Sequence, residues 1–242
     1  MLSPLPDIVP FGERLRASAA LQRLARPALR VRRNENVYMY GDRDDSVYLI
    51  QSGQIKLSTC NAEAKSCTLG IFGAGDVFGE LSLVTQSRAE TATAMKDSFL
   101  RQIKSYDLLS WLTSNDLIES FVNHLLVRIA VHQQTISNLV TCDSERRLAS
   151  VLLQLGKQLR TLDDRRSYVE CAISQQELAQ MVGTTRTRVG QFLKKFRALG
   201  LIEKLPRAFP IINEERLTAY LETTGGERTP TPSKKMSRSA HY

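Results

Sequence analysis

The sequence predicts an α+β protein in which a small antiparallel β-barrel or roll precedes a helical C-terminal half. Short strand-like runs separated by turns extend from about residue 37 to residue 100, and Ile55, Leu57 and Thr59 alternate there with a period of two. Helical periodicity takes over from about residue 115. With 242 residues, the chain is long enough to form two domains.

The first predicted domain covers residues 1–114. Up to about Arg33 it contains two weakly helical stretches, around residues 11–18 and 20–29. The strands that follow are predicted in the runs VYLIQSG, QIKLSTC, CTLGIFGAG and TATAM, with glycine and aspartate clusters between them supplying the turns.

A long helix is predicted next, over residues 115–142, with Ser114 as its N-cap. Its apolar positions recur in alternating steps of three and four, which is the a/d pattern of a coiled coil. The seam consists of Val122, Leu125, Ile129, His132, Ile136 and Leu139. This pattern favours a partner helix and therefore a homodimer. The alternative is that the helix packs on its own domain.

Residues 143–222 form the second predicted domain. After a helix over about residues 144–160 comes the stretch ISQQELAQMVGTTRTRVGQFLKKFR, residues 173–197. Ala179 falls where two helices approach closely, Gly183 falls in the turn between them, and Val189 faces the core, which is the spacing of a helix-turn-helix that reads DNA. The alternative is an ordinary helical hairpin with a solvated basic face.

The boundaries and outer face of this motif are also predicted. Ser174 and Glu177 form a capping box at the start of the first helix, and Thr185 caps the second. The side chains expected to meet DNA are Gln175, Thr185, Arg186, Thr187, Arg188 and Gln191.

Beyond the motif, LIEKLPRAFPII predicts the two short strands of a wing and NEERLTAYLE a final helix. Residues 223–242 have the composition of a disordered basic tail. Its Lys234, Lys235 and Arg238 either contact DNA phosphates without specificity or remain solvated.

Charge is distributed unevenly along the chain. Residues 1–142 hold 15 basic and 14 acidic residues, whereas residues 143–242 hold 18 and 11. The excess positive charge therefore lies on the half with the helix-turn-helix, as phosphate contact requires. The chain has no apolar run long enough to cross a membrane and no evident signal peptide, so we expect a cytoplasmic protein.

The composition also bears on cofactors and catalysis. The four cysteines, Cys60, Cys67, Cys142 and Cys171, are expected to be reduced thiols, with an alternative in which Cys60 and Cys67 face each other across a hairpin. No spacing of histidine and cysteine predicts a metal site, and no nucleophile-base pair or phosphate-binding loop predicts an enzyme.

The order of roll, long helix and winged helix-turn-helix resembles the cyclic AMP receptor protein and fumarate-nitrate reductase regulator family of bacterial transcription factors. The resemblance covers roughly residues 35–220, through the stretches GDRDDSVYLIQSGQIKL, GAGDVFGELSL and NLVTCDSERRLASVLLQL and the helix-turn-helix. It implies a homodimer that binds a palindromic DNA operator, works with RNA polymerase and responds to a small effector, with cyclic AMP as the leading candidate and no covalent cofactor.

The resemblance also implies an effector site. Gly79, Glu80, Leu81, Ser82 and Arg88 look like the phosphate cassette of cyclic-nucleotide sensors, because backbone N–H groups and a guanidinium can hold a phosphate. The sequence departs from the family pattern in the short span from Glu80 to Arg88, in Ala89 where Ser or Thr is common, and in Glu90, which adds a negative charge. If Arg88 and Thr91 share one strand face through a local irregularity, Ala89 and Glu90 cannot both point into the pocket, so Glu90 faces away and Ala89 admits the ligand.

One alternative is that Glu80 and Arg88 simply form an ion pair in a sensor that has lost its ligand. On the long helix, the resemblance aligns His132 and Gln133 with the residues that contact adenine. His132 either couples the ligand to the dimer or is a packed core histidine. Arg128 corresponds to an arginine of the members that sense 2-oxoglutarate, but some cyclic AMP sensors also carry it, so that effector stays an alternative.

The family reads its half-site with an arginine, a glutamate and a second arginine on the recognition helix. Arg186 matches the first and is expected to bond guanine. Thr187 and Gln191 replace the other two, which predicts the loss of a cytosine contact and a new adenine contact. Gln175 and Thr185 are expected to contact phosphate.

Overall fold

The computed structural model describes residues 11, 12, 15, 28–63, 65–85, 87–158, 173–203 and 211–223. Phe11, Gly12 and Leu15 are helical, within the first stretch expected to be weakly helical. The rest of the two expected N-terminal helices lies outside the described residues, apart from residues 28 and 29, and so does the tail from residue 224 onward.

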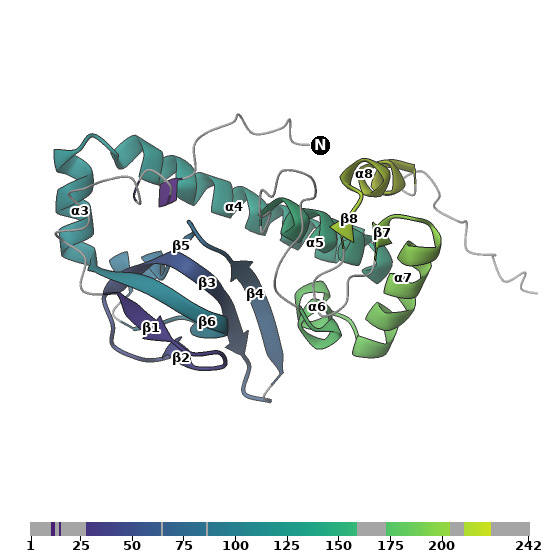
Figure 1. Ribbon diagram of the computed structural model, residues 1–242, viewed down its shortest axis with the longest axis horizontal. Helices are drawn as coiled ribbons and strands as arrows, with labels where there is room; N and C mark the ends of the chain where they lie inside the picture. The colour runs from purple at the N-terminus through teal and green to yellow at the C-terminus, as the bar shows by residue number, and fades with distance from the viewer. Residues whose placement is uncertain are drawn as a thin grey trace, which may run out of the picture.

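The N-terminal half is an antiparallel β-roll (Figure 1). Its strands are β1 (Leu29–Val31), β2 (Asn36–Tyr38), β3 (Ser46–Cys60), β4 (Ser66–Phe72), β5 (Val77–Phe78) and β6 (Thr91–Lys104). The sheet order is β1-β6-β3-β4, with β2 paired to β6 and β5 paired to β3. The two long strands, β3 and β6, therefore form the frame on which the short strands are arranged.

Strand β3 joins two strands that the sequence predicts separately. The bend between them is at Gly53, which has a φ of 108° and lies among irregularities of the β3–β6 register. A Cβ atom at this position would lie 2.1 Å from the Ser98 hydroxyl oxygen, so the close approach of β6 requires glycine. The expected alternation holds, because Ile55 and Leu57 are buried in the roll.

Helices cover one end of the roll. After the short 3₁₀ turn η1 (Glu80–Leu83), β6 leads into α3 (Ser105–Ser114) and then α4 (Ile118–Thr141). The expectation that Ser114 caps the long helix is wrong: Ser114 is the last residue of α3, and the positive φ of Asp116 separates the two helices. Helix α3 was not expected from the sequence, although it buries Leu108, Trp111 and Leu112, which are spaced as on one face of a helix.

The C-terminal half contains α5 (Ser144–Gln158), α6 (Gln175–Val182), α7 (Arg186–Ala198), β7 (Ile202–Glu203), β8 (Ile211–Ile212) and α8 (Glu214–Thr223). The predicted wing strands pair antiparallel, and the residues between them lie outside the described part. Leu148, Leu152 and Phe196 are fully buried at the centre of this half. Its apolar cluster also includes Ile71 and Met95 of the roll.

Helix α4 runs along the roll and reaches the C-terminal half (Figure 1). Its apolar seam is largely open: Val122, Ile129, Ile136 and Leu139 are exposed, at 45%, 50%, 62% and 47%. Leu125, in contrast, packs on the cluster between the roll and α3. Among the described helices, none is both long and apolar enough to cross a membrane.

Candidate functional site

Helices α6 and α7 form a helix-turn-helix whose boundaries match the prediction. The Ser174 hydroxyl accepts a hydrogen bond from the Glu177 amide at 3.1 Å, and the Glu177 carboxylate accepts one from the Ser174 amide at 2.9 Å. Both halves of the capping box are thus present. At the start of α7, the Thr185 hydroxyl accepts from the Arg188 amide, which confirms the second cap.

The turn between the two helices depends on Gly183. It adopts φ 68° and ψ 50°, a left-handed conformation that favours glycine. Ala179 and Val189 are almost fully buried where the helices meet, as their spacing predicts. The two helices are therefore held at a fixed angle by residues near the turn.

Arg147 of α5 contacts this turn through hydrogen bonds, a role that was not expected from the sequence. Its Nε donates to the Val182 carbonyl at 2.8 Å, its Nη1 to the Cys142 carbonyl at 2.8 Å and its Nη2 to the Gly183 carbonyl at 3.4 Å. One side chain thus links the end of α4 to the helix-turn-helix. No local pattern reveals this role, because two of its three acceptors, the carbonyls of Val182 and Gly183, lie at least 35 positions away in the chain.

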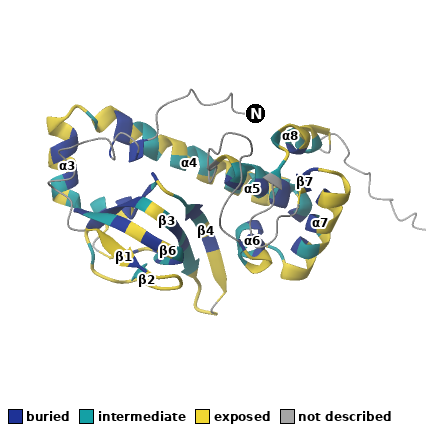
Figure 2. Ribbon diagram, in the orientation of Figure 1, coloured by how far each residue is buried: buried dark blue, intermediate teal, exposed yellow. Residues whose placement is uncertain are grey.

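The side chains predicted to read bases lie on the open face of α7. Arg186, Thr187, Arg188 and Gln191 are all exposed, and Figure 2 shows this edge of the molecule uncovered. Thr187 and Gln191 are four residues apart and so share a face of the helix. The Arg188 guanidinium lies 5.9 Å from the centre of the Phe192 ring. All four side chains are thus accessible from outside the protein.

The two residues expected to contact phosphate are also exposed. Gln175 leans on α7: a Cβ atom at Gly190 would lie 3.2 Å from its amide oxygen. The missing side chain at Gly190 therefore lets the start of α6 approach the recognition helix closely.

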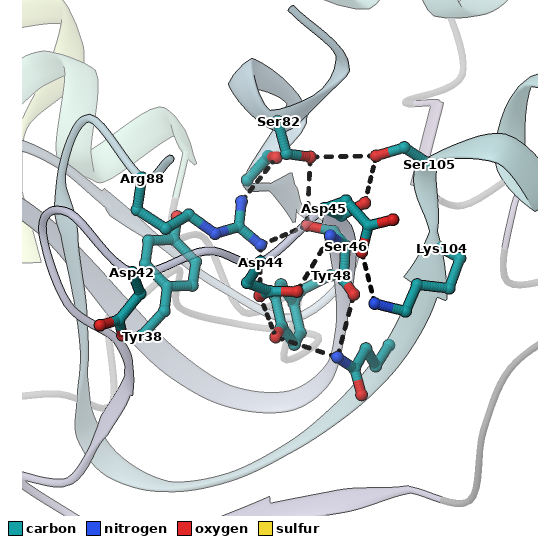
Figure 3. A network of polar contacts seen from close by, with 12 residues as sticks. Tyr38, Asp42, Asp44, Asp45, Ser46, Tyr48, Ser82, Arg88, Lys104 and Ser105 are labelled. Atoms are coloured by element: carbon teal, nitrogen blue, oxygen red, sulfur yellow. Dashed lines mark hydrogen bonds and ion pairs between the residues drawn. The ribbon is translucent and has the colours of Figure 1, made fainter. Parts of the chain in front are cut away.

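In the roll, Arg88 is buried with only 2% of its surface exposed, and both terminal nitrogens of its guanidinium are hydrogen-bonded, whereas its Nε has no hydrogen-bond partner among the described residues (Figure 3). It donates to the Asp44 carboxylate and the Ser46 carbonyl, both at 2.5 Å, and to the Gly79 carbonyl at 2.9 Å. It also lies 4.0 Å from the centre of the Tyr38 ring. Burial opposes ionisation of Asp44, but hydrogen bonds from Arg88, Tyr48 and Ser46 hold its pKa below the ordinary value.

The rest of the expected cassette surrounds this arginine. Gly79 has a φ of 83°, and a Cβ atom there would lie 2.9 Å from Arg88 Nη1. The Ser82 hydroxyl is 3.1 Å from that of Ser105 and 3.4 Å from the Ser46 carbonyl, whereas Leu81 is exposed. The structure therefore brings the cassette residues together around a guanidinium that protein groups already hold.

Glu80 pairs with Arg128 of α4, not with Arg88. The carboxylate oxygen of Glu80 and the Nη1 of Arg128 are 2.6 Å apart, and both side chains are largely buried. Arg128 also lies 4.9 Å from the centre of the Phe72 ring. The alternative of a Glu80–Arg88 ion pair is thus wrong, because Asp44 is the acid that reaches Arg88. The Glu80–Arg128 pair ties the cassette to the long helix.

The expected orientations of Ala89 and Glu90 are reversed. Glu90 is buried and accepts a hydrogen bond from the Tyr38 hydroxyl at 3.0 Å, whereas Ala89 is exposed. Side chains do alternate here, but in the phase that puts Glu90 on the same side as Arg88. Burial raises the pKa of Glu90, and the nearby Glu80 carboxylate raises it further despite the bond from Tyr38.

On α4, His132 and Gln133 are exposed. His132 is near enough to Arg128 and Glu80 for their charges to act on it, and burial followed by Arg128 lowers its pKa. His132 is therefore not a core histidine within the single chain. The structure gives Gln133 no contact with the cassette.

The alternative in which Cys60 and Cys67 face each other across the hairpin is wrong. Cys60 lies opposite Ser66 and Cys67 opposite Thr59, so the two thiols project from opposite faces of the hairpin and do not face each other. Cys171 lies outside the described residues. Within the described part of the chain, no group of His, Cys, Asp and Glu side chains could hold a metal ion.

We predict that Glu90→Gln stabilises the protein at neutral pH. The raised pKa means that ionised Glu90 is less favourable in the folded than in the unfolded state, and an uncharged amide removes that cost while still accepting from Tyr38. The gain in melting temperature should shrink as the pH falls from neutral toward the ordinary glutamate pKa of 4.5 and vanish below it, where both states are protonated.

The control is Glu63→Gln, since Glu63 is exposed on the β3–β4 turn and this change should leave the melting temperature unaltered. A Glu90→Gln variant that is less stable than the wild type at neutral pH, but equally stable below pH 4.5, would show that the ionised carboxylate is needed by its neighbours.

Comparison with protein families agrees with this architecture. A model of the cyclic nucleotide-binding domain matches residues 28–115, and a model of the Crp-like helix-turn-helix domain matches residues 146–220. The two matches fall on the roll with α3 and on the half that contains α5 to α8.

Curated relatives share the same organisation. A CRP-like cAMP-activated global transcriptional regulator of Mycobacterium tuberculosis is 29% identical over 187 residues, covering 76% of this chain and 84% of that protein. A cyclic AMP receptor protein of Thermus thermophilus is 29% identical over 189 residues, covering 77% and 82%.

Solved structures show the same fold at lower identity. A CooA mutant from Carboxydothermus hydrogenoformans superposes with a TM-score of 0.70 at 21% identity, over 88% of this chain and 96% of that one. FixK2 from Bradyrhizobium japonicum has a TM-score of 0.70 at 17% identity, over 81% and 96%. The chain belongs to the CRP/FNR family and is a DNA-binding transcriptional regulator with a cyclic nucleotide-binding domain, not an enzyme.

Proposed function

We propose that this protein is a homodimer that reads a palindromic operator with α7 and adjusts its affinity through an effector bound in the roll. The observation that carries the proposal is the open polar face of α7, presented by a capped helix-turn-helix in a chain whose long helix has an exposed apolar seam. Such a regulator would act in the cytoplasm, together with RNA polymerase.

The exposed seam of α4 supports the dimer. Large apolar side chains that recur along one helix face and remain in solvent are typical of a surface that a partner covers. A two-fold partner would place two copies of α7 about 34 Å apart, one turn of DNA. The two-fold symmetry of the dimer would therefore match the two-fold symmetry of the palindrome.

We predict that Ile136→Lys converts the dimer into monomers. Ile136 is 62% exposed in the single chain, so the substitution should leave each monomer folded while placing a charge in the seam. Sedimentation equilibrium measures the change, and Ser137→Lys, also exposed but outside the seam, is the matched control. Equal dimerisation of the two variants would mean that the seam is not the dimer interface.

For DNA reading, we propose that Arg186 bonds guanine through O6 and N7, that Gln191 bonds adenine, and that Thr185 and Gln175 contact phosphate. We expect Arg186→Ala to cost about 1 to 3 kcal/mol on an operator selected from random duplexes and to relax the preference at one base pair. Fluorescence anisotropy measures both effects.

Lys194→Ala removes the same charge from an exposed position of α7 and serves as the control. It should weaken binding to all sequences alike. A loss for Arg186→Ala that is equally large on random DNA would reduce Arg186 to a phosphate contact.

Cyclic AMP is the effector that we propose first. The roll matches a cyclic nucleotide-binding domain, the relatives in the comparison include cAMP-activated regulators, and Arg88 lies beside the backbone of Gly79 to Ser82. Asp44 holds the same guanidinium that the phosphate would use, so the two anions compete. On α4, His132 and Gln133 could then meet the purine.

A regulator that needs no effector is the second candidate. It is favoured by the engaged state of the two arginines, since Arg88 is held by Asp44 and Arg128 by Glu80. These pairs balance the buried charges without any bound anion. The same observation counts against 2-oxoglutarate, which would have to displace Glu80 from Arg128.

We predict that Asp44→Asn tightens the binding of cyclic AMP. The amide oxygen can still accept from Arg88, but the competing negative charge is gone. Calorimetric titration with cyclic AMP and 2-oxoglutarate measures this. A ligand at about 100 times its dissociation constant should also stabilise the protein by about 2.7 kcal/mol.

Asp45→Asn is the control, because Asp45 is largely exposed and pairs with Lys104, not Arg88. If neither the wild type nor Asp44→Asn binds cyclic AMP or 2-oxoglutarate, both effector proposals are overturned and the effector-independent regulator becomes the leading one.

A further inference from the structure

The two halves of the chain touch at a second place besides the covalent connection between α4 and α5. Strand β4 lies against α6 (Figure 1), the first helix of the helix-turn-helix. Lys56 of β3 pairs with Glu177 of α6 at 3.1 Å, and Thr68 of β4 donates to the Gln180 side chain at 3.0 Å. We call this contact the roll–α6 latch, formed by Lys56, Thr68, Ile71, Glu177 and Gln180.

The roll side of the latch is one face of the sheet. Lys56 and Ile71 are directly opposite each other in the β3–β4 register, so their side chains share a face. Leu57, the next residue after Lys56, points the other way into the core of the roll. Ile71 is fully buried, although it faces away from that core, because it joins the apolar cluster of the C-terminal half.

The helix side of the latch is the start of the helix-turn-helix. Glu177 belongs to the capping box of α6 and also binds Lys56. The side chains of Lys56 and Glu177 are 23% and 17% exposed, so the pair is shielded from solvent. Burial opposes ionisation, but hydrogen bonds from Ser174 and Lys56 hold the pKa of Glu177 below its ordinary value. The latch therefore holds the start of α6, the helix whose angle to α7 sets the orientation of α7.

The latch leaves the recognition helix open. Arg186, Arg188 and Gln191 remain exposed while α6 is docked on the roll. A contact that blocked DNA would cover these side chains. The docked arrangement is therefore compatible with entry of α7 into a major groove.

We propose that the roll–α6 latch pre-positions the recognition helices, with Lys56 acting as a positioning residue through Glu177. This inference rests on the proposed function, a dimer that reads a palindrome. The α4 seam fixes the two rolls relative to each other, and the latch fixes each α7 relative to its roll. Without it, the helix-turn-helix loses its polar contacts with the roll through Lys56 and Thr68, and the fraction of dimers with the correct half-site spacing falls.

The test compares a full palindrome with a duplex that carries one half-site. Lys56→Gln removes the pair without adding a repulsion. If it lowers the competent fraction to a tenth, the dissociation constant on the palindrome rises about tenfold, whereas the half-site constant stays the same because spacing does not matter there. Lys56→Arg retains the charge and should bind like the wild type.

Lys65→Gln is the matched control. Lys65 is at the β3–β4 turn, is 78% exposed and pairs only with Glu63 among the described residues. The substitution therefore removes the same charge as Lys56→Gln but leaves the contact with α6 unchanged. Its palindrome affinity should equal that of the wild type. Thr68→Val is a second latch variant and should shift the palindrome affinity in the same direction as Lys56→Gln.

Three results would overturn the proposal that the latch positions the recognition helices. Unchanged palindrome binding by Lys56→Gln would remove its positioning role, tighter binding would make the contact inhibitory, and an equal loss on both duplexes would mean local damage to α6. A wild type that prefers the palindrome no more than the half-site would instead refute the proposed function, and the latch with it.

Discussion

The buried guanidinium of Arg88 is the constraint on which the roll depends. A charge with 2% exposure is tolerated only when hydrogen bonds and an opposite charge replace water, and Asp44, Gly79 and Ser46 provide them. Removing one partner of such a buried pair costs about 3 to 5 kcal/mol, since the remaining charge has no solvent. The loop before β3, the turn after β5 and the start of β6 are all held by this one side chain.

The hydrogen-bonded pair of Arg88 and Asp44 also determines how an anionic effector can bind in the roll. An anion in the roll would have to share Arg88 with Asp44, and it would meet two further carboxylates, those of Glu80 and Glu90. Of these carboxylates, that of Glu90 is one of the places where this chain departs from the usual family pattern. We therefore expect charge balance within the roll to set how strongly any anionic effector binds.

Coupling between the two halves passes through charged side chains at three places. Arg128 binds the cassette to α4, Arg147 binds the end of α4 to the turn of the helix-turn-helix, and Lys56 binds the roll directly to α6. Each joins segments that are remote in sequence. A change at the cassette therefore has a physical connection to the recognition helix, along α4 and across the latch.

Local patterns in the sequence determined the helix-turn-helix, its caps, the alternation in β3 and the seam of α4, because these depend on residues a few positions apart. They did not reveal α3, the partners of Arg88 and Glu80, the inward direction of Glu90 or the roles of Arg147 and Lys56. Those were decided by the tertiary structure, which brings together residues up to 121 positions apart, as in the pair of Lys56 and Glu177. A buried charge takes whichever opposite charge the fold places beside it, and spacing along the chain does not encode that choice.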